Sequence, residues 1–410
     1  MRVVIVGGGV IGLCSALYCA ERGMRVTVVE RNGERRDGCS YGNTGMIVPS
    51  HFVPLAAPGM VGLALKWMWN PASPFYVKPR ASPDLAAWGL RFWRAANALH
   101  VSRAAPILAR LHMESRALYE ALAATASFHL EKRGVLVLCR TAHALDEEAA
   151  LVQQASALGL SARVLDARAA AALEPDVRID AIGGVHIAED CNVEPRVLMD
   201  ALQRKCAAAG VGFVWSTEAR GWRKEGHSIR ALSTPAGDIE ADEFVLSAGS
   251  WSTPLARELG LRLPMQAGKG YSLTLERPRR SPRTCAVLSE ARVSVSPMNG
   301  SLRFGGTMEL AGLDETVNPI RVRGIIEAVQ RYLPDFTAAD FEGVQPWRGL
   351  RPCTPDGLPY VGRTARVENL VVATGHAMMG VSLGPVTGKL VAGILSGEQS
   401  HNLLSPDRYD

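Results

Sequence analysis

Residues 1–30 read MRVVIVGGGVIGLCSALYCAERGMRVTVVE, and this stretch decides the fold. A β-branched run at residues 2–6 breaks into glycines, a helical pattern follows at residues 13–22, and a second β-branched run at residues 25–30 ends on an acid. Strand, glycine turn, helix and second strand in this order are typical of a Rossmann βαβ unit. The sequence therefore predicts an α/β fold that begins with a dinucleotide-binding domain.

Each glycine of the turn has its own task in such a unit. Gly7 permits the tight turn, Gly9 lets the backbone approach a pyrophosphate, and Gly12 lets helix and strand pack closely. The free N–H groups at the start of the helix bind the anion. Glu30 is expected to accept hydrogen bonds from the adenosine ribose, and its charge argues against a 2′-phosphate. NAD and FAD both fit this unit.

The composition is that of an ordinary globular protein of 410 residues, of which 47% are hydrophobic and 21% charged. The net charge of +5 is spread along the chain without a basic block, so we expect no nucleic-acid partner. The eight cysteines show no CxxC and no metal-ligand spacing, which predicts reduced thiols, no metal site and a cytoplasmic protein. No stretch approaches the roughly 20 apolar residues of a transmembrane helix, so any membrane contact is expected to be peripheral.

Two segments after the first unit differ in character from it. Residues 39–49, CSYGNTGMIVP, combine small and polar residues in a loop that either lines the cofactor or lies at the surface. Residues 51–79 carry aromatic side chains among prolines, with Lys66 and Lys78 beside them. Aromatic and basic residues together suit a membrane interface, but an amphipathic segment that covers the substrate domain explains the same pattern. The sequence leaves both interpretations open.

A second glycine-rich turn lies near the end of the chain, where residues 374–397 read TGHAMMGVSLGPVTGKLVAGILSG. Gly375 and Gly380 open the turn, and an apolar helix begins near residues 383–387. The N–H groups and the dipole of such a helix start stabilise the negative charge that a flavin gains at N1 and the C2 carbonyl when it is reduced. One glycine-rich helix start for the pyrophosphate and another for the isoalloxazine ring together predict FAD.

Strands that alternate beyond residue 254 indicate a second domain with a mostly antiparallel sheet. No repeat or low-complexity linker separates it from the first. We therefore expect a Rossmann-type FAD-binding domain interleaved with an α+β substrate domain. The expected FAD-binding segments are residues 1–80, 183–253 and 345–410, and the expected substrate segments are residues 81–182 and 254–344. Within the latter, residues 83–126 predict two helices that break near Pro106.

The motifs together resemble those of the FAD-dependent D-amino-acid oxidoreductases, and within that family most closely the bacterial D-amino-acid dehydrogenases. The matching pieces are MRVVIVGGGVIG at residues 1–12, SYGNTGMI at 40–47, PLAAPGMVGLALKWM at 54–68, KGYSLTL at 269–275, GLRPCTPDGLPYVG at 349–362 and TGHAMMG at 374–380. They span nearly the whole chain in the order found in the family. The resemblance is specific for the family and less specific for the substrate.

The resemblance implies how a substrate carboxylate is bound. In related glycine oxidases the arginine of the GLRP stretch pairs with that carboxylate, and the matching residue is Arg351. Arginine supplies the planar bidentate donor that a carboxylate requires. Arg348 is the competing candidate, and a structural ion pair is the alternative role for Arg351. Tyr271 resembles a family tyrosine that lines the site, and we expect it to be a second donor to the carboxylate.

Residues beside the flavin are also implied by the resemblance. We expect His376 to orient the cofactor or the substrate and not to act as a base. Met378 and Met379 stand where glycine oxidases carry a polar or basic residue, which favours a substrate larger or more apolar than glycine. The residues expected to bind FAD are Gly7, Gly9, Val10, Ile11, Gly12, Glu30, Arg31, Ser40, Asn43, Thr44, Gly45, Met46, Ala219, Ser247, Ala248, Gly249, Trp251, Gly349, Gly375, Met378, Met379, Gly380, Val381 and Ser382.

The implied reaction is the oxidation of a D-amino acid, D-proline and D-hydroxyproline types included, to an imine and a 2-oxo acid by hydride transfer to flavin N5. The expected electron acceptor is a quinone or another acceptor that is not oxygen, and a peripheral protein of this kind would lie at the inner face of the membrane. An oxygen-using oxidase of glycine or sarcosine and a flavin subunit of a larger dehydrogenase complex remain as alternatives.

Overall fold

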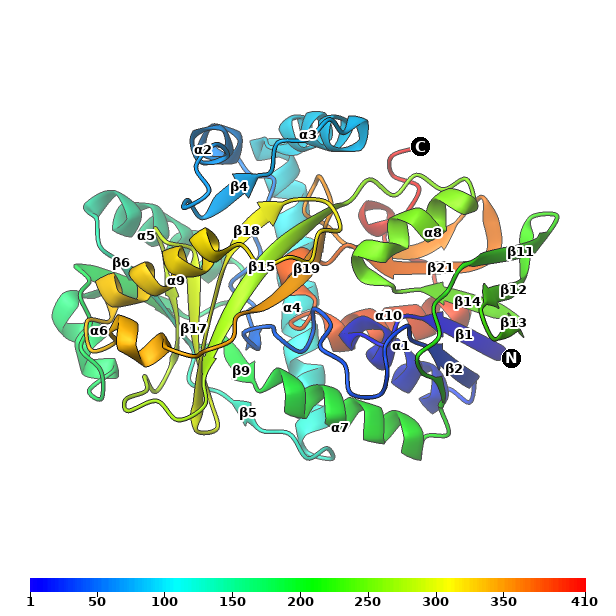
Figure 1. Cartoon of the computed structure of the whole chain (residues 1–410), viewed down its shortest axis with the longest axis horizontal. Helices are drawn as coiled ribbons and strands as arrows, with labels where there is room; N and C mark the ends of the chain where they lie inside the picture. The colour runs from blue at the N-terminus through cyan, green and yellow to red at the C-terminus, as the bar shows by residue number, and fades with distance from the viewer.

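A parallel sheet built on the first thirty residues is the core of one half of the molecule (Figure 1). In the computed structural model, which describes residues 1–410, its six strands lie in the order β10 (Gly212–Val214), β2 (Arg25–Val29), β1 (Arg2–Val6), β14 (Glu243–Leu246), β21 (Val367–Thr374) and β20 (Tyr360–Thr364). All of them run parallel except β20. The predicted Rossmann-type sheet is confirmed.

Both faces of this sheet are covered, which explains why β1 is apolar without alternation. Val3 and Ile5 face a layer of helices, whereas Val4 and Val6 face the opposite side. The helical layer consists of α1 (Val10–Glu21), α4 (Ala98–Ala123), α7 (Pro195–Ala208) and α10 (Gly384–Leu395). The other layer consists of the small sheet β11 (Gly221–Glu225), β12 (Ser228–Thr234) and β13 (Gly237–Glu240), together with α8 (Ser252–Glu258).

The other half of the molecule is built on a nine-stranded sheet (Figure 1). Its order is β19 (Trp347–Cys353), β15 (Gln266–Leu275), β18 (Ser301–Leu310), β17 (Val293–Met298), β16 (Cys285–Leu288), β6 (Val135–Cys139), β8 (Gly183–Ile187) and β7 (Ala162–Asp166), with β4 (Phe75–Val77) paired to β18. Only the pairs β16–β6 and β18–β4 are parallel. The helices α5 (Ala142–Ala157), α6 (Ala167–Leu173) and α9 (Pro319–Tyr332) pack against it. The expected antiparallel character of this sheet is confirmed.

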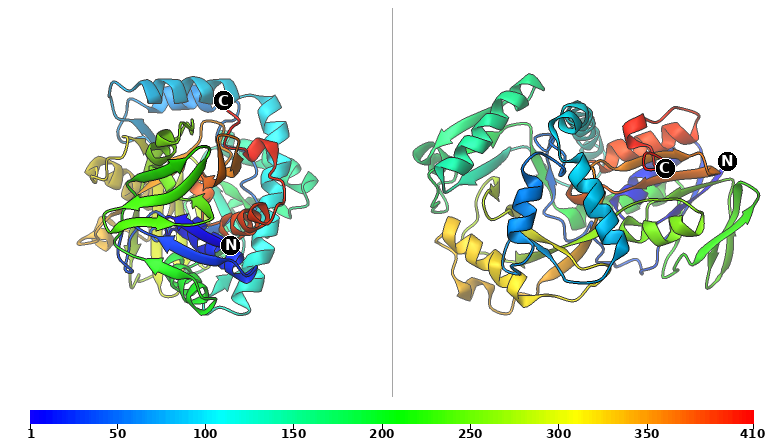
Figure 2. Two further views of the ribbon diagram at one scale, coloured as in Figure 1. Left: turned by 90° about the vertical axis from the view of Figure 1, so that its right-hand side faces the viewer. Right: turned by 90° about the horizontal axis from the view of Figure 1, so that it is seen from above.

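An outer layer lies over the junction of the two halves, as the views in Figure 2 show. It consists of α2 (Met60–Trp67), β4 and α3 (Pro83–Ala95). Trp88 and Phe92 of α3 stack with their ring centroids 5.2 Å apart, and they pack with Leu310, Cys353 and Ala377. Since these three residues belong to β18, β19 and the 3-10 helix η3 (Ala377–Met379), the outer layer touches both halves.

Short elements complete the chain. A small sheet of β3 (Met46–Ile47), β9 (Cys191–Val193) and β5 (Leu130–Glu131) lies between the halves, and further 3-10 helices are η1 (Gly249–Trp251), η2 (Ala338–Phe341) and η4 (Asn402–Leu404). No helix combines the length and the apolar composition that crossing a bilayer requires.

The chain crosses between the halves more often than the expected segments allow. β4, β8 and β19 belong to the large sheet, although they lie in segments expected to bind FAD. In the opposite direction, α4 packs against α10 beside the parallel sheet, although residues 81–182 were expected in the substrate domain. The reason is that the residue pattern of an apolar strand or helix does not indicate which of the two sheets it packs against.

The expected helix break near Pro106 is wrong. α3 ends at Ala95, and α4 runs without interruption from Ala98 to Ala123 with Pro106 inside it. The break lies at Asn97, whose side chain caps α4 by accepting a hydrogen bond from the His100 N–H (2.9 Å). Tertiary packing of α4 on α10 therefore outweighs the hydrogen bond that the proline removes.

Candidate active site

A cavity of about 460 Å³ opens at the carboxyl ends of β1 and β2, where α1 begins. In doubly wound sheets ligands bind at this edge. The wall is completed by the loop at residues 36–43, by residues 217–220 and 247–255 after β10 and β14, and by residues 373–381 before α10. The two glycine-rich turns of the sequence therefore meet in one cavity, as the FAD prediction required.

The backbone of the first turn leaves no room for side chains. Gly7 has a φ of +107°, and a Cβ on it would lie 2.6 Å from the carbonyl oxygen of Ser247. A Cβ on Gly12 would lie 1.9 Å from the Gly7 carbonyl oxygen. Gly9 is the N-cap of α1 and offers no side-chain cap. The Val10 N–H donates to Ser40 Oγ (3.0 Å), and the N–H groups of the next residues are left for an anion. The turn thus fits a pyrophosphate in the way that the sequence predicted.

Glu30 is buried at the end of β2 and faces this turn. Its carboxylate accepts hydrogen bonds from the Gly8 N–H (2.8 Å) and the Asn32 N–H (3.0 Å). These two donors satisfy part of the buried negative charge and leave further lone pairs for the hydroxyl groups of a ribose. The position at the cavity wall fits the predicted role.

Arg36, a wall residue that the sequence did not single out, supports the turn. Arg36 donates to the carbonyl oxygen of Gly8 through Nε (3.2 Å) and Nη2 (3.0 Å). Its guanidinium lies over the rings of Tyr41 (5.3 Å to the centroid) and Trp215 (4.6 Å). Arg31 also lines the cavity and lies 3.6 Å from the ring centroid of Trp251. No local pattern distinguishes Arg36 from neighbouring arginines, because its partners come from three separate segments.

Helix α4 holds the second turn in place. Ser115 donates to the carbonyl oxygen of Ser382 (2.6 Å), and Tyr119 donates to that of Val381 (2.5 Å). His112 Nδ1 lies 2.8 Å from Ser382 Oγ. Burial and neighbouring histidine charges lower the pKa of His112 to about 3, so this ring is neutral. The spacing places these three side chains near one face of α4, but the helix also carries charged residues such as Arg110 and Glu114, so no sequence signal set them apart.

His376 lies in the wall of the cavity, at the start of the second turn. Its Nε2 is 2.9 Å from Thr387 Oγ1 of α10, and its ring is buried. Burial lowers its pKa to about 3. A neutral histidine already hydrogen-bonded to a helix is suited to orient neighbouring groups and poorly suited to accept a proton near neutral pH.

Arg351 lies on β19 next to the cavity, since Pro352 and Cys39 are both wall residues. Burial raises the pKa of the Cys39 thiol and the nearby Arg351 charge opposes this shift. The guanidinium lies flat on Gly270 of β15, where a Cβ would come within 2.3 Å of Nη2. Its Nη1 donates to the carbonyl oxygen of Thr307 (2.7 Å), and Arg351 takes part in no ion pair. An arginine without a carboxylate partner at this position is free to bind one.

The competing candidate Arg348 already has carboxylate partners. It pairs with Asp37 (3.3 Å) and Glu315 (3.7 Å), and it donates to the Glu315 carbonyl oxygen (2.9 Å). Arg348 is opposite Tyr271 in the register of β19 and β15, whereas Arg351 is opposite Gly268. Side chains alternate between the faces of a strand, so Arg348 and Arg351 lie on opposite faces of the sheet.

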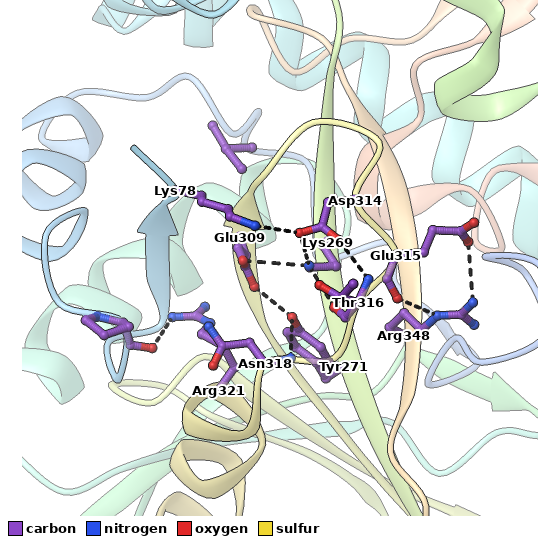
Figure 3. Close-up of polar contacts among 12 residues, drawn as sticks. Lys78, Lys269, Tyr271, Glu309, Asp314, Glu315, Thr316, Asn318, Arg321 and Arg348 are labelled. Atoms are coloured by element: carbon purple, nitrogen blue, oxygen red, sulfur yellow. Dashed lines mark hydrogen bonds and ion pairs between the residues drawn. The ribbon is translucent and has the colours of Figure 1, made fainter. Parts of the chain in front are cut away.

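The expectation that Tyr271 donates to the substrate carboxylate is wrong for the same geometric reason. Tyr271 points to the face covered by α9 and is buried there (Figure 3). Its hydroxyl donates to Glu309 Oε2 (2.7 Å) and accepts from the Asn318 N–H (3.3 Å). Lys269 also points to this face and lies 3.7 Å from Glu309 Oε1 and 3.5 Å from Asp314 Oδ2. Tyr271 therefore belongs to a buried polar network behind the sheet.

The predicted cofactor residues divide into two groups. The first group lines the cavity and consists of Gly7, Gly9, Val10, Ile11, Glu30, Arg31, Ser40, Asn43, Ala219, Ser247, Ala248, Gly249, Trp251, Gly380 and Val381. The second group does not line it and consists of Gly12, Thr44, Gly45, Met46, Gly349, Gly375, Met378, Met379 and Ser382. In the second group, the Trp347 indole fills the space over Gly349, Met379 lies against His112, and the side chain of Met378 is exposed.

Comparison with known families identifies the chain. The family described as FAD dependent oxidoreductase matches residues 2–394. The chain belongs to this family. FAD is therefore its cofactor, and the residues around the cavity fit that cofactor at both glycine-rich turns. The chain is thus a flavin-dependent oxidoreductase, as its motifs implied.

Individual relatives agree with the family over nearly the full length. The D-amino acid dehydrogenase of Paramagnetospirillum magneticum is 33% identical over 408 residues, which cover 98% of this chain and 96% of that protein. The protein of the same name from Vibrio atlanticus is 31% identical, with 98% and 97% covered. Among solved structures, a glycine oxidase from Geobacillus kaustophilus has a TM-score of 0.79 at 25% identity, with 100% and 99% covered. An L-proline dehydrogenase from P. horikoshii shares the fold, with a TM-score of 0.78 at 17% identity and 100% and 97% covered.

Proposed function

We propose that the protein oxidises D-amino acids and passes the electrons to an acceptor other than oxygen. The observation that carries the proposal is the guanidinium of Arg351, which lies beside the FAD cavity without an ion-pair partner. The full-length relatives named D-amino acid dehydrogenase support this choice of substrate class. D-Proline and D-hydroxyproline are included in the proposed class.

The residues of the chain perform three tasks in this reaction. Arg351 binds the substrate carboxylate through two parallel hydrogen bonds and thereby aims Cα at the flavin. The apolar cluster of Trp88, Leu310, Cys353 and Ala377 excludes water on the same side of β19. His376 stays neutral and orients groups at the flavin. The bound flavin supplies the hydride acceptor. A substrate that binds as the neutral amine, after its ammonium proton has passed to bulk water, needs no dedicated protein base.

The test is anaerobic bleaching of the flavin by D- and L-amino acids, glycine, sarcosine and proline derivatives, followed by admission of air. Bleaching by D-amino acids with slow reoxidation is the expected result. Arg351→Met should retain FAD and weaken the binding of benzoate, a simple carboxylate probe read from the flavin spectrum, by at least about tenfold. Arg348→Met is the matched control, because it removes an arginine of the same strand from the other face. Equal benzoate affinity in native protein and Arg351→Met would overturn the proposed role.

A second candidate function is an oxidase of glycine or sarcosine that uses oxygen. The similarity to the glycine oxidase from Geobacillus kaustophilus favours it. Bleaching by glycine or sarcosine with fast reoxidation and peroxide release would select this function. A flavin subunit of a larger complex is favoured if no amine bleaches the pure chain.

We further propose that the outer layer contacts the membrane and brings a quinone acceptor to the protein. Four large apolar side chains of α2, α3 and the residues after α2 are exposed: Leu65 (57%), Trp69 (72%), Leu90 (48%) and Trp93 (62%). The exposed bases Lys66 and Arg94 accompany them, which suits anionic headgroups. Substitution of Trp69 and Trp93 by serine should abolish sedimentation with anionic vesicles, whereas Val164→Ser, an exposed residue of β7, should not. Native protein that does not sediment with vesicles would contradict the proposal.

A further inference from the structure

Arg321 is the largest fully buried side chain of the molecule, and the reaction proposed above does not use it. It lies near the start of α9, behind the large sheet (Figure 3). Burial lowers the pKa of its guanidinium to about 10, so it is charged at neutral pH. A buried charge is costly unless hydrogen bonds compensate it, so the acceptors around this guanidinium indicate its role.

Four backbone carbonyl groups surround the guanidinium. Nη1 donates to the carbonyl oxygens of Pro71 (3.0 Å) and Ser73, and Nη2 donates to those of Pro74 (3.0 Å) and Met308 (3.1 Å). The first three carbonyls belong to the segment that leads into β4, and the fourth belongs to β18. Arg321 thus fastens the base of the outer layer to the strand beside the candidate active site.

The peptide unit between Thr307 and Met308 connects this arginine with Arg351. Its carbonyl, that of Thr307, accepts the hydrogen bond from Arg351 Nη1 (2.7 Å). Its N–H, that of Met308, donates to the Pro74 carbonyl oxygen (2.8 Å), which also accepts from Arg321. Because a peptide unit is planar, the Pro74 carbonyl on one side determines where the Thr307 carbonyl points on the other.

This peptide unit is not in a relaxed strand conformation. The ladder between β15 and β18 shifts its register between Lys269 and Tyr271, opposite Thr307. Thr307 has a φ of +62°, which is unfavourable for a β-branched residue. Such a conformation persists only where the surroundings enforce it. The contacts that enforce it here are those of Pro74 and Arg321.

We propose that Arg321 is a positioning residue for carboxylate binding: it fixes the peptide unit between Thr307 and Met308, and that unit orients the Arg351 guanidinium. The inference rests on the proposed role of Arg351. Arg321 does not line the cavity and makes no hydrogen bond to Arg351, but the two guanidinium charges act on each other. A variant that keeps the charge of Arg321 is therefore needed to isolate its effect on the direction in which Arg351 presents its donors.

The experiment compares a carboxylate with its neutral analogue on FAD-loaded protein. Binding of benzoate and of benzamide is titrated by the change in the flavin spectrum for native protein, Arg321→Met, Arg321→Lys, and the control Arg323→Met, which removes an exposed arginine of the same helix. Arg321→Met should weaken benzoate by about tenfold and leave benzamide within about twofold. Arg321→Lys keeps the charge without the planar fork of donors, so it should recover only part of the benzoate affinity. Arg323→Met should change neither.

A general loosening of the site weakens both probes equally, and that result in the variants of Arg321 would overturn the inference, as would unchanged benzoate binding. If Arg321→Met yields no FAD-loaded protein, the comparison is made with Arg321→Lys: a larger loss of benzoate affinity than of benzamide affinity supports the inference. Arg351→Met distinguishes the positioning role of Arg321 from the carboxylate-binding role of Arg351. Weaker benzoate binding in Arg351→Met with unchanged binding in the Arg321 variants overturns only the positioning role, whereas unchanged binding in Arg351→Met overturns the carboxylate role itself.

Discussion

Replacing Gly270 by alanine displaces the Arg351 guanidinium without disturbing the fold. The added Cβ would lie 2.3 Å from Nη2 and 2.4 Å from Cζ and Nη1 of Arg351, whereas ordinary contact begins at 3.4 Å. The guanidinium must therefore move by at least about 1.1 Å, the difference between 3.4 and 2.3 Å. It is the far end of a flexible side chain, so the movement costs little stability. The hydrogen bond to Thr307, now 2.7 Å, is lost in the process.

The expected loss of carboxylate binding follows from this displacement. A misplaced charged donor forfeits about 1.5–3 kcal/mol, which corresponds to roughly a 10- to 150-fold weaker benzoate affinity and a similar fall in kcat/KM for the amino acid. FAD content and the midpoint of thermal unfolding should stay near those of native protein. The assay is the benzoate titration of the flavin spectrum combined with anaerobic bleaching.

The matched control is Gly268→Ala, which adds the same methyl group two residues away on the same face of β15. There the Cβ meets Cys353 Sγ at 2.8 Å and not the guanidinium. We expect this variant to lose stability while it retains more of its benzoate affinity than Gly270→Ala. Equal benzoate losses in the two variants would refute the reasoning, because they would point to a distorted strand in place of a displaced arginine.

Three further predictions concern other parts of the molecule. Glu30→Gln should weaken FAD binding by about 10- to 100-fold in a fluorescence titration of the deflavinated protein, since the hydrogen bonds from the Gly8 and Asn32 N–H groups lose their charged acceptor. The control Glu34→Gln should leave FAD affinity unchanged. Burial raises the pKa of Asp190 to about 7 although Ser50 donates to it twice, so the folded state holds this proton more tightly than the unfolded chain. The stabilisation from this proton is complete below about pH 4 and is lost as the pH rises to about 7. In urea unfolding, the free energy of unfolding of the native protein should therefore fall by about 1–3 kcal/mol relative to that of Asp190→Asn between pH 5 and pH 8. Parallel pH profiles of the two proteins would contradict this. Tyr271→Phe should lower the free energy of unfolding by about 1–2 kcal/mol because Glu309 loses a hydrogen-bond donor, yet leave benzoate affinity within about twofold; the reverse outcome would return Tyr271 to the substrate side.

The nucleotide half of the fold could be predicted because its signals are local. The glycine turn joins strand and helix of one βαβ unit, where Gly12 packs against the Gly7 carbonyl oxygen, and Glu30 follows at the end of the next strand. The second glycine turn is equally local, and its meeting with the first in one cavity follows once both are assigned to a flavin.

The supports of the site escaped prediction because their partners are distant in the chain. His112, Ser115 and Tyr119 belong to a helix that was expected in the other domain, and they hold residues more than 260 positions away. Arg36 likewise has partners in three segments. Their residue types have no special spacing, because any polar side chain at those points of space would serve.

By itself the sequence determined the α/β class and the FAD cofactor, since both rest on residue types at short spacing. It singled out Arg351 only through the resemblance of the GLRP stretch to a family motif. Only the tertiary structure decided which face of β15 and β19 each side chain takes. Tyr271 and Arg351 both lie in family-like motifs, yet the pairing register places them on opposite faces. In the role proposed for Arg321, the orientation of Arg351 depends in addition on the backbone at Thr307, which contacts from Pro74, before β4, and from α9 hold in place. Strand register and an enforced backbone conformation are properties of packed neighbours, so no single stretch of sequence contains them.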